Sequence, residues 1–176
     1  MALPRNIILV GFMASGKSRV GRILARHTGW PLVDADEEIV CRCGKPIPQI
    51  FEEEGEAAFR AVERSIIADL CAGSGRIIAA GGGAFVDPDN RRRMLDSGLV
   101  FCLGARAETI QRRVGKGAAA RPLMAGDHSL ERIQTLLAQR AEVYAQAHHT
   151  IETDRLTPDE VARSILGLCP GIPSEK

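Results

Sequence analysis

The stretch GFMASGKS at residues 11–18 fits the phosphate-binding pattern G-x-x-x-x-G-K-[ST]. It lies between an apolar run, NIILV at 6–10, and a segment whose apolar residues have helical spacing. In this setting the backbone N–H groups of residues 14–18 line the positive end of a helix and form a cradle for a β-phosphate. Lys17 can reach the β- and γ-phosphates, and the Ser18 hydroxyl is a hard oxygen ligand suited to Mg²⁺. The sequence therefore predicts a site for a nucleoside triphosphate.

Outward from this loop, short apolar runs alternate with amphipathic segments. The runs predict five strands, at 6–10, 31–34, 76–80, 99–103 and 149–153. Between them, helical spacing or helix-start signals predict helices that end near Gly29, begin at Glu56 and at Pro88, and span 106–114, 130–144 and 158–168. A helical stretch interrupted at Gly44, Pro46 and Pro48 precedes Glu56. Alternating strands and helices indicate an α/β fold, a doubly wound five-stranded parallel sheet flanked by helices.

Length and composition indicate one ordinary globular domain. The chain has 176 residues, of which 45% are hydrophobic and 26% charged, and its formal net charge is +1. We expect a single domain over residues 1–170 with a loose C-terminal tail at 171–176. The small net charge gives no reason to expect a nucleic-acid or membrane partner. No apolar run approaches the roughly 20 residues that cross a bilayer, so the cytoplasm is the expected location.

The cysteines give no metal or disulfide framework. Their number, five, is odd, and they are scattered along the chain. Cys41 and Cys43 form a C-x-C pair, but no second Cys or His pair lies at zinc-like spacing. We expect reduced, mostly buried thiols.

What the protein does with its nucleotide can be narrowed by elimination. A GTP switch would need D-x-x-G and N-K-x-D motifs, and the chain has neither. A motor ATPase would need an apolar strand ending in Asp-Glu, but the strands at 76–80 and 99–103 end in Ala80 and Leu103. Transfer of a phosphoryl group to a small acceptor is the reaction that is left.

Three features stand where a second substrate should bind, beyond the carboxyl ends of the strands. Asp34 and Asp36 follow the second predicted strand and could cap a helix, hold a metal or grip a substrate. Arg60 and Glu63 lie one helical turn apart, so that Glu63 could orient the arginine, although such pairs are usually solvated. Gly81–Gly83 end the third strand, where a ligand could approach the backbone closely or the chain could simply turn.

Taken together, the motifs resemble the shikimate kinase family over about residues 6–168. The motifs, in order, are GFMASGKS, DAD at 34–36, FRAVE at 59–63, GGG at 81–83, RPL at 121–123 and RAEVY at 140–144. The resemblance implies a nucleoside-monophosphate-kinase-like fold with a mobile lid at approximately 113–127. It also implies a monomeric enzyme that uses ATP and Mg²⁺ to phosphorylate shikimate on its 3-hydroxyl, in the route to chorismate and the aromatic amino acids.

On the acceptor side, the resemblance assigns four residues. Arg60 and Arg140 would hold the carboxylate of shikimate, because guanidinium groups pair with carboxylates bidentately and stay charged. Asp36 would accept hydrogen bonds from ring hydroxyls and is a candidate to take the proton of the attacking one. Gly82 would offer its backbone N–H to the acceptor.

On the nucleotide side, the resemblance places Asp34 near Mg²⁺ through water, with Ser18 as the direct ligand. Arg121, in the lid, would stabilise charge on the transferring phosphoryl group, and Arg113 would stack on adenine. Lys17, Asp36 and Arg121 are thus the expected catalytic residues. The expected nucleotide contacts are Gly11, Ala14, Ser15, Gly16, Lys17, Ser18, Arg19, Arg113 and Arg121. Near the family's C-terminal nucleotide contact this chain offers only Arg155, which we leave unassigned.

Two other functions stay open at this point. A kinase of the same fold for another small hydroxy acid, such as a gluconate kinase, would have the same glycine loop. A regulatory nucleotide-binding module with degenerate catalysis is the second alternative, although Lys17, Ser18, Asp34 and Asp36 are all intact.

Overall fold

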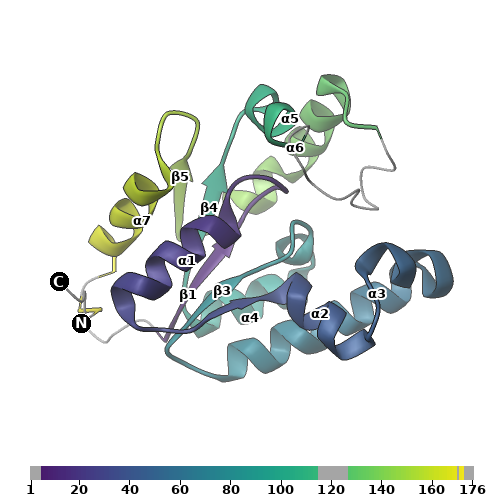
Figure 1. The fold of residues 1–176 in the computed structure, drawn as a ribbon, viewed down its shortest axis with the longest axis horizontal. Coiled ribbons are helices and arrows are strands. Elements are labelled where there is room, and N and C mark those ends of the chain that lie inside the picture. Colours follow the sequence, from purple (N-terminus) through teal and green to yellow (C-terminus); the bar gives the residue numbers. More distant parts are fainter. Residues whose placement is uncertain (1–4, 115–126, 170, 173–176) are drawn as a thin grey trace.

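The computed structural model describes residues 5–114, 127–169 and 171–172. Its core is a sheet of five parallel strands in the order β2-β3-β1-β4-β5 (Figure 1). The strands are β1 (Asn6–Val10), β2 (Leu32–Asp34), β3 (Arg76–Ala79), β4 (Leu99–Gly104) and β5 (His149–Glu152). Each boundary is within one residue of its predicted place, so the α/β fold with five parallel strands is confirmed.

The central position of β1 in the sheet explains why its sequence is apolar throughout. β1 pairs with β3 on one side and with β4 on the other, and all five of its residues are buried. Side chains of a strand alternate between faces, so Ile8 and Val10 enter one core cluster while Ile7 and Leu9 enter another. A strand covered on both faces has no polar side, as its sequence shows.

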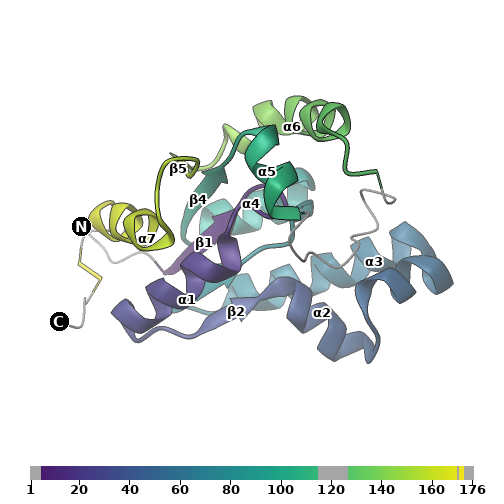
Figure 2. The ribbon, with the colours of Figure 1, turned by 45° about the horizontal axis from the view of Figure 1, so that its top comes forward.

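Helices cover both faces of the sheet. The helices are α1 (Lys17–Thr28), α2 (Ala35–Cys43), α3 (Ile47–Ala72), α4 (Pro88–Ser97), α5 (Ala107–Val114), α6 (Leu130–Tyr144) and α7 (Pro158–Gly167), with a 3-10 turn η1 (Ala84–Val86). α1 and α7 lie side by side over one face, and α2, α3, α4 and α6 pack on the other (Figure 1). At the carboxyl edge, α5 and α6 stand opposite α2 and the start of α3 (Figure 2).

One local expectation was wrong. Pro48 does not interrupt a helix but lies in the first turn of α3, where its missing N–H costs no hydrogen bond. The helix expected from Glu56 is confirmed as the second part of α3, which follows a kink at Gly55, a residue with φ of 83°. The turn η1, between β3 and α4, was not predicted from the sequence.

Other expectations concern the thiols and the chain termini. All five cysteines are free, and Cys71, Cys102 and Cys169 are buried. Ile172 packs against the cluster under α1 and α7, whereas residues 173–176 of the expected tail lie outside the described residues. In the described part of the chain, no helix combines the length and apolar character needed to cross a bilayer.

The sheet order places the ligand sites. β1 has β3 and β2 on one side and β4 and β5 on the other, so the strand order changes direction at β1. In open α/β sheets, ligands bind beyond the carboxyl ends of the strands at such a point. The glycine loop after β1, the aspartates after β2 and the three glycines after β3 all lie there.

Candidate active site

The phosphate loop, residues 11–16, joins β1 to α1 and is shaped by its glycines. A Cβ atom added to Gly11 would lie 2.6 Å from the carbonyl oxygen of Leu103 on β4, so only glycine fits that contact. Gly16 is the N-cap of α1 and supplies no side chain to bond the first N–H groups of the helix. The loop and helix start therefore present an anion-binding site, as the sequence predicts.

The apex of this loop holds a residue in an unfavourable conformation. Ala14 has φ of 57° and is the one non-glycine residue of the described segments with positive φ. The guanidinium of Arg113 donates from Nη1 to the carbonyl oxygens of Ala14, at 3.2 Å, and Ser15, at 3.4 Å. Arg113, expected to stack on adenine, therefore also supports the loop in this structure.

Ala14→Gly is expected to stabilise the protein. An L-residue in the left-handed region costs about 1–2 kcal/mol, from which the extra chain entropy of glycine, about 0.4–1 kcal/mol, must be subtracted. We expect a net gain of roughly 0.5–1 kcal/mol, or about 2 °C in the melting temperature of a chain of this size. Differential scanning calorimetry would measure it.

Ala68→Gly, in the regular second part of α3, is the matched control. There the same substitution should lower the melting temperature, because glycine is unfavourable inside a helix. A decrease for both variants would show that the Ala14 conformation carries no strain.

Lys17 is buried at the base of the loop. Only 8% of the residue is exposed, and Nζ donates to the carbonyl oxygens of Gly11 and Phe12, both at 2.9 Å. These bonds keep the ammonium group beside the helix start. A phosphate arriving there offers the same group a charged acceptor, which binds more strongly than a neutral carbonyl.

Ser18 and Asp34 meet across the gap between α1 and β2. Ser18 Oγ donates to Asp34 Oδ2 at 2.6 Å, while Asp34 Oδ1 accepts from the backbone N–H of Asp36 at 3.0 Å and so caps α2. The capping alternative is therefore present, and the same side chain contacts Ser18, the expected ligand of Mg²⁺. Both groups line a cavity of about 270 Å³ with Lys17 and Asp36.

The donor set suits Mg²⁺ bound to a nucleotide. One hydroxyl and one carboxylate oxygen at a phosphate loop are hard ligands, and Mg²⁺ usually completes its shell with water and substrate phosphates. The described residues contain no cluster of three or more His, Cys, Asp or Glu that could hold a metal alone. The residues therefore fit a magnesium ion that arrives with ATP.

On the acceptor side, three charged residues crowd the glycine turn after β3. Arg60 Nη1 pairs with Glu63 Oε2 at 2.6 Å. A Cβ atom at Gly81 would lie 2.7 Å from Asp36 Oδ1, and one at Gly83 would lie 3.0 Å from two nitrogen atoms of Arg60. The absence of side chains at Gly81 and Gly83 gives these charged groups room against the turn.

Glu63 is the least exposed of these charged residues, at 2%. Burial raises the pKa of its carboxyl, an effect that the nearby guanidinium of Arg60 opposes and the carboxylate of Asp36 reinforces. A buried acid that pairs with an arginine orients that arginine, as its spacing in the sequence suggested. We did not include Glu63 among the expected site residues.

α6 contributes two residues from the opposite side. Arg140 Nη1 donates to the carbonyl oxygen of Gly82 at 3.0 Å, and its guanidinium lies over the ring of Phe12, 5.3 Å from the centroid. The hydroxyl of Tyr144, one helical turn further, donates to the same oxygen at 2.7 Å. Tyr144 was absent from the expected site; its spacing of four residues from Arg140 was the available signal.

The remaining expected residues divide into two groups. Arg19 is exposed but lines the same cavity as Ser18 and Asp34. Arg121, and with it residues 115–126 of the expected lid, lie outside the described residues. Apart from Arg121, the structure thus brings the predicted residues to one edge of the sheet.

Comparisons with known proteins agree with this arrangement. The family model described as shikimate kinase matches residues 13–169. A shikimate kinase of Symbiobacterium thermophilum is 42% identical over 163 residues, which cover 92% of this chain and 94% of that protein. A shikimate kinase of Thermus thermophilus is 41% identical over 160 residues, with 91% and 87% covered.

A solved structure gives the same result in three dimensions. The shikimate kinase of Acinetobacter baumannii in complex with shikimate superposes with a TM-score of 0.89 at 37% identity, covering 95% of this chain and 93% of that one. The shikimate kinase of Aquifex aeolicus superposes with a TM-score of 0.79 at 34% identity.

Proposed function

Since the chain belongs to the shikimate kinase family, we propose that it transfers the γ-phosphoryl group of ATP to the 3-hydroxyl of shikimate, giving 3-phosphoshikimate and ADP. The enzyme is an ATP-dependent phosphotransferase of the route to chorismate and the aromatic amino acids. One observation carries the assignment of the site. The phosphate loop and the Arg60–Glu63 pair lie at the same sheet edge, and Asp36 both lines the cavity at the loop and lies beside Gly81, next to Glu63.

The nucleotide half uses the loop and the start of α1. Backbone N–H groups of residues 14–18 bind the β-phosphate, and Lys17 moves its ammonium group from the carbonyls of Gly11 and Phe12 to the β- and γ-phosphates. Ser18, and Asp34 through water, would hold Mg²⁺. A bound Mg²⁺ neutralises charge on the β- and γ-phosphoryl oxygens. We further assign Arg19 and Arg113 to nucleotide contacts, Arg113 through adenine stacking.

The acceptor half uses the residues around the glycine turn. Arg60 and Arg140 bind the carboxylate of shikimate with their guanidinium groups. Glu63 keeps Arg60 at this place. The N–H of Gly82 donates to the acceptor, and Asp36 accepts hydrogen bonds from ring hydroxyls. Fixed arginines and a fixed carboxylate leave one orientation of the ring, which brings one hydroxyl to the γ-phosphate.

The transfer step requires little covalent participation by the protein. The oxygen of the 3-hydroxyl forms a bond to the γ-phosphorus while the bond from that phosphorus to the β,γ-bridging oxygen breaks, so that ADP leaves. The proton of the hydroxyl passes to the carboxylate of Asp36. Charge that develops on the transferring group is stabilised by Lys17 and, on the strength of the RPL motif, by Arg121.

Several broader assignments accompany this function. We propose a monomer of one domain over residues 1–170, built on a single five-stranded sheet. The small acceptor makes a nucleic-acid or membrane partner unnecessary. Five free cysteines suit a reducing compartment, which supports the cytoplasm.

A coupled assay of ADP release tests the function. The enzyme with ATP and Mg²⁺ is given shikimate, gluconate or no acceptor. We expect ADP release that depends on shikimate, with only background release in the other two reactions. Equal rates with and without shikimate in folded protein would refute the proposal, and turnover with gluconate would favour the alternative hydroxy-acid kinase.

A further inference from the structure

The carbonyl group of Gly82 receives two hydrogen bonds from one face of α6. Tyr144 Oη donates at 2.7 Å and Arg140 Nη1 donates at 3.0 Å, and both residues lie 58 or more positions away in the sequence. A carbonyl oxygen has two lone pairs, so this pair of donors uses its full capacity. The turn after β3 is thereby joined to α6 at a single atom.

The other carbonyl groups of the turn are held locally. Gly81 O accepts from the N–H of Ala84 at 3.1 Å, and Gly83 O accepts from the N–H of Val86 at 3.1 Å, both through η1. Gly82 O is therefore the carbonyl whose direction depends on a distant element. In the described part of the chain, the N–H groups of Gly82 and Gly83 donate to no backbone carbonyl.

The peptide between Gly82 and Gly83 lies between the two arginines assigned to the acceptor. Arg140 bonds its carbonyl, and two nitrogen atoms of Arg60 would lie 3.0 Å from a Cβ atom at Gly83. Because a peptide group is planar, a donor that fixes the direction of the Gly82 carbonyl also fixes the direction of the Gly83 N–H. The direction of the Gly83 N–H thus depends on this peptide, and the Gly82 N–H assigned to the acceptor belongs to the adjoining peptide, which shares the Gly82 Cα atom.

A conflict arises when Arg140 binds an acceptor. The same guanidinium nitrogen that bonds Gly82 O is also a donor that a carboxylate would attract, and a charged acceptor is preferred to a carbonyl. If the guanidinium, which has five N–H groups, turned away from Gly82 to meet the carboxylate bidentately, the partly buried carbonyl would need a second donor to avoid a cost in free energy. The Tyr144 hydroxyl remains as that second donor.

We propose that Tyr144 is a positioning residue for the acceptor: its hydroxyl keeps the Gly82–Gly83 peptide in place while Arg140 turns to the carboxylate of shikimate. This inference rests on the proposed function. Tyr144 is suited to the role because it is 8% exposed and its ring packs in the core cluster, so that its hydroxyl has a fixed position. Burial raises the pKa of the Tyr144 phenol, so the group remains a donor at neutral pH.

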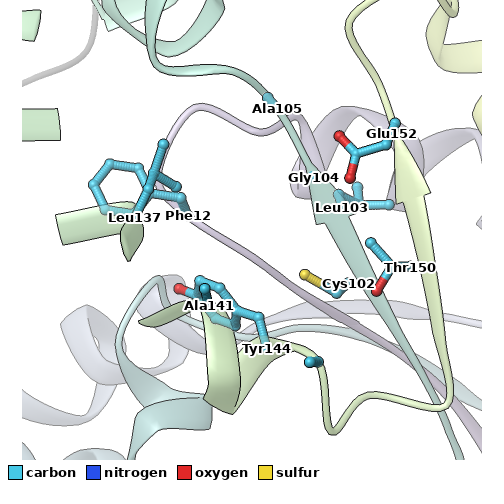
Figure 3. Close-up of a pocket in the computed structure, with 11 residues that line it drawn as sticks. Phe12, Cys102, Leu103, Gly104, Ala105, Leu137, Ala141, Tyr144, Thr150 and Glu152 are labelled. Atoms are coloured by element: carbon cyan, nitrogen blue, oxygen red, sulfur yellow. The ribbon is translucent and has the colours of Figure 1, made fainter. Parts of the chain in front are cut away.

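The surroundings of the ring determine which substitution is informative. The ring forms part of the wall of a cavity of about 310 Å³, together with Phe12 and Cys102 (Figure 3). Removing the ring would enlarge this cavity and disturb the phosphate loop through Phe12. Tyr144→Phe removes the hydroxyl alone and keeps the packing.

Steady-state kinetics of Tyr144→Phe test the proposal. We expect KM for shikimate to rise roughly 5- to 10-fold, as the loss of one hydrogen bond would produce, with kcat and KM for ATP within about twofold of wild type. Thr135→Val, which removes an exposed hydroxyl from the same helix, is the matched control and should change none of these values. A purely structural role would lower the melting temperature and leave KM for shikimate unchanged.

A double-mutant cycle makes the test specific to the shared carbonyl. If Tyr144 and Arg140 support the same oxygen, the effects of Tyr144→Phe and Arg140→Lys should not be independent. The increase in KM for shikimate in the double variant should then differ from the product of the two single-variant increases by more than about threefold. Two results would overturn the inference and leave the proposed function standing, provided that the wild type turns over shikimate normally. One is an increase in the double variant equal to the product of the single increases, and the other is an unchanged KM for shikimate in Tyr144→Phe. Absence of shikimate turnover by the wild type would overturn the proposed function, and the inference with it.

Discussion

Replacing Lys17 with methionine is expected to lower kcat by roughly 10²- to 10³-fold, the usual loss when one preorganised electrostatic donor is removed. Nζ bonds the carbonyl oxygens of Gly11 and Phe12, and the residue is almost fully buried. The ammonium group thus lies beside the start of α1, where the phosphates are proposed to bind. Methionine keeps most of the apolar stem and removes the charge that stabilises the transferring phosphoryl group. Single-turnover measurements at saturating ATP and shikimate would give the rate of the chemical step.

Arg26→Ala is the control for Lys17→Met. Arg26 is an exposed basic residue near the other end of α1, and its removal changes the net charge equally. The kcat of Arg26→Ala should stay within about twofold of the wild-type value, since surface charges far from the reacting group have small effects. Equal losses in the two variants would mean that net charge, and not the position of the ammonium group, governs the rate. A Lys17→Met enzyme with normal kcat would contradict the assigned role outright.

Arg60→Ala is expected to raise KM for shikimate by roughly 10- to 100-fold, because hydrogen bonds to charged groups contribute about 1.5–3 kcal/mol each. Two effects add in this variant. The acceptor carboxylate loses a guanidinium partner, and the buried carboxylate of Glu63 loses the cation bonded to it at 2.6 Å. Binding of ATP should stay nearly intact, since Arg60 lies against Gly83 and not against the phosphate loop. Initial rates with each substrate varied in turn would separate the two constants.

Arg64→Ala provides the matched control four residues further along α3. Arg64 is exposed and pairs with Asp87 at 3.3 Å on the surface, an arrangement that contributes little. We expect the Arg64→Ala variant to have an unchanged KM for shikimate. A collapse of ATP binding in Arg60→Ala would show that the residue belongs to the nucleotide half of the site.

Much of this site could be predicted because the signals were local. The glycine loop combines a fixed motif with a strand before it and a helix after it, and all three lie within residues 6–28. Asp34 was expected to lie near Mg²⁺ or to cap a helix; one of its oxygen atoms caps α2 and the other accepts from Ser18. Strands covered on both faces were recognisable as short apolar runs.

The residues that the sequence did not identify depend on tertiary contacts. Tyr144 looks like a core residue of an amphipathic helix, and its ring is one; only the approach of α6 to the turn after β3 gives its hydroxyl a partner 62 residues away. Arg113 was expected at the nucleotide, but its contact with Ala14, 99 residues away, was likewise not predicted. Neither distance along the chain nor side-chain periodicity contains this information.

Transfer of the γ-phosphoryl group of ATP to an alcohol is tested most directly by following that group. The enzyme would be incubated with ATP labelled with ³²P at the γ-position, Mg²⁺ and shikimate, and the products separated by anion-exchange chromatography. We predict that the label appears in 3-phosphoshikimate in an amount equal to the ADP formed, with little in inorganic phosphate. Label found only in inorganic phosphate, or retained in ATP by folded enzyme, would contradict the account.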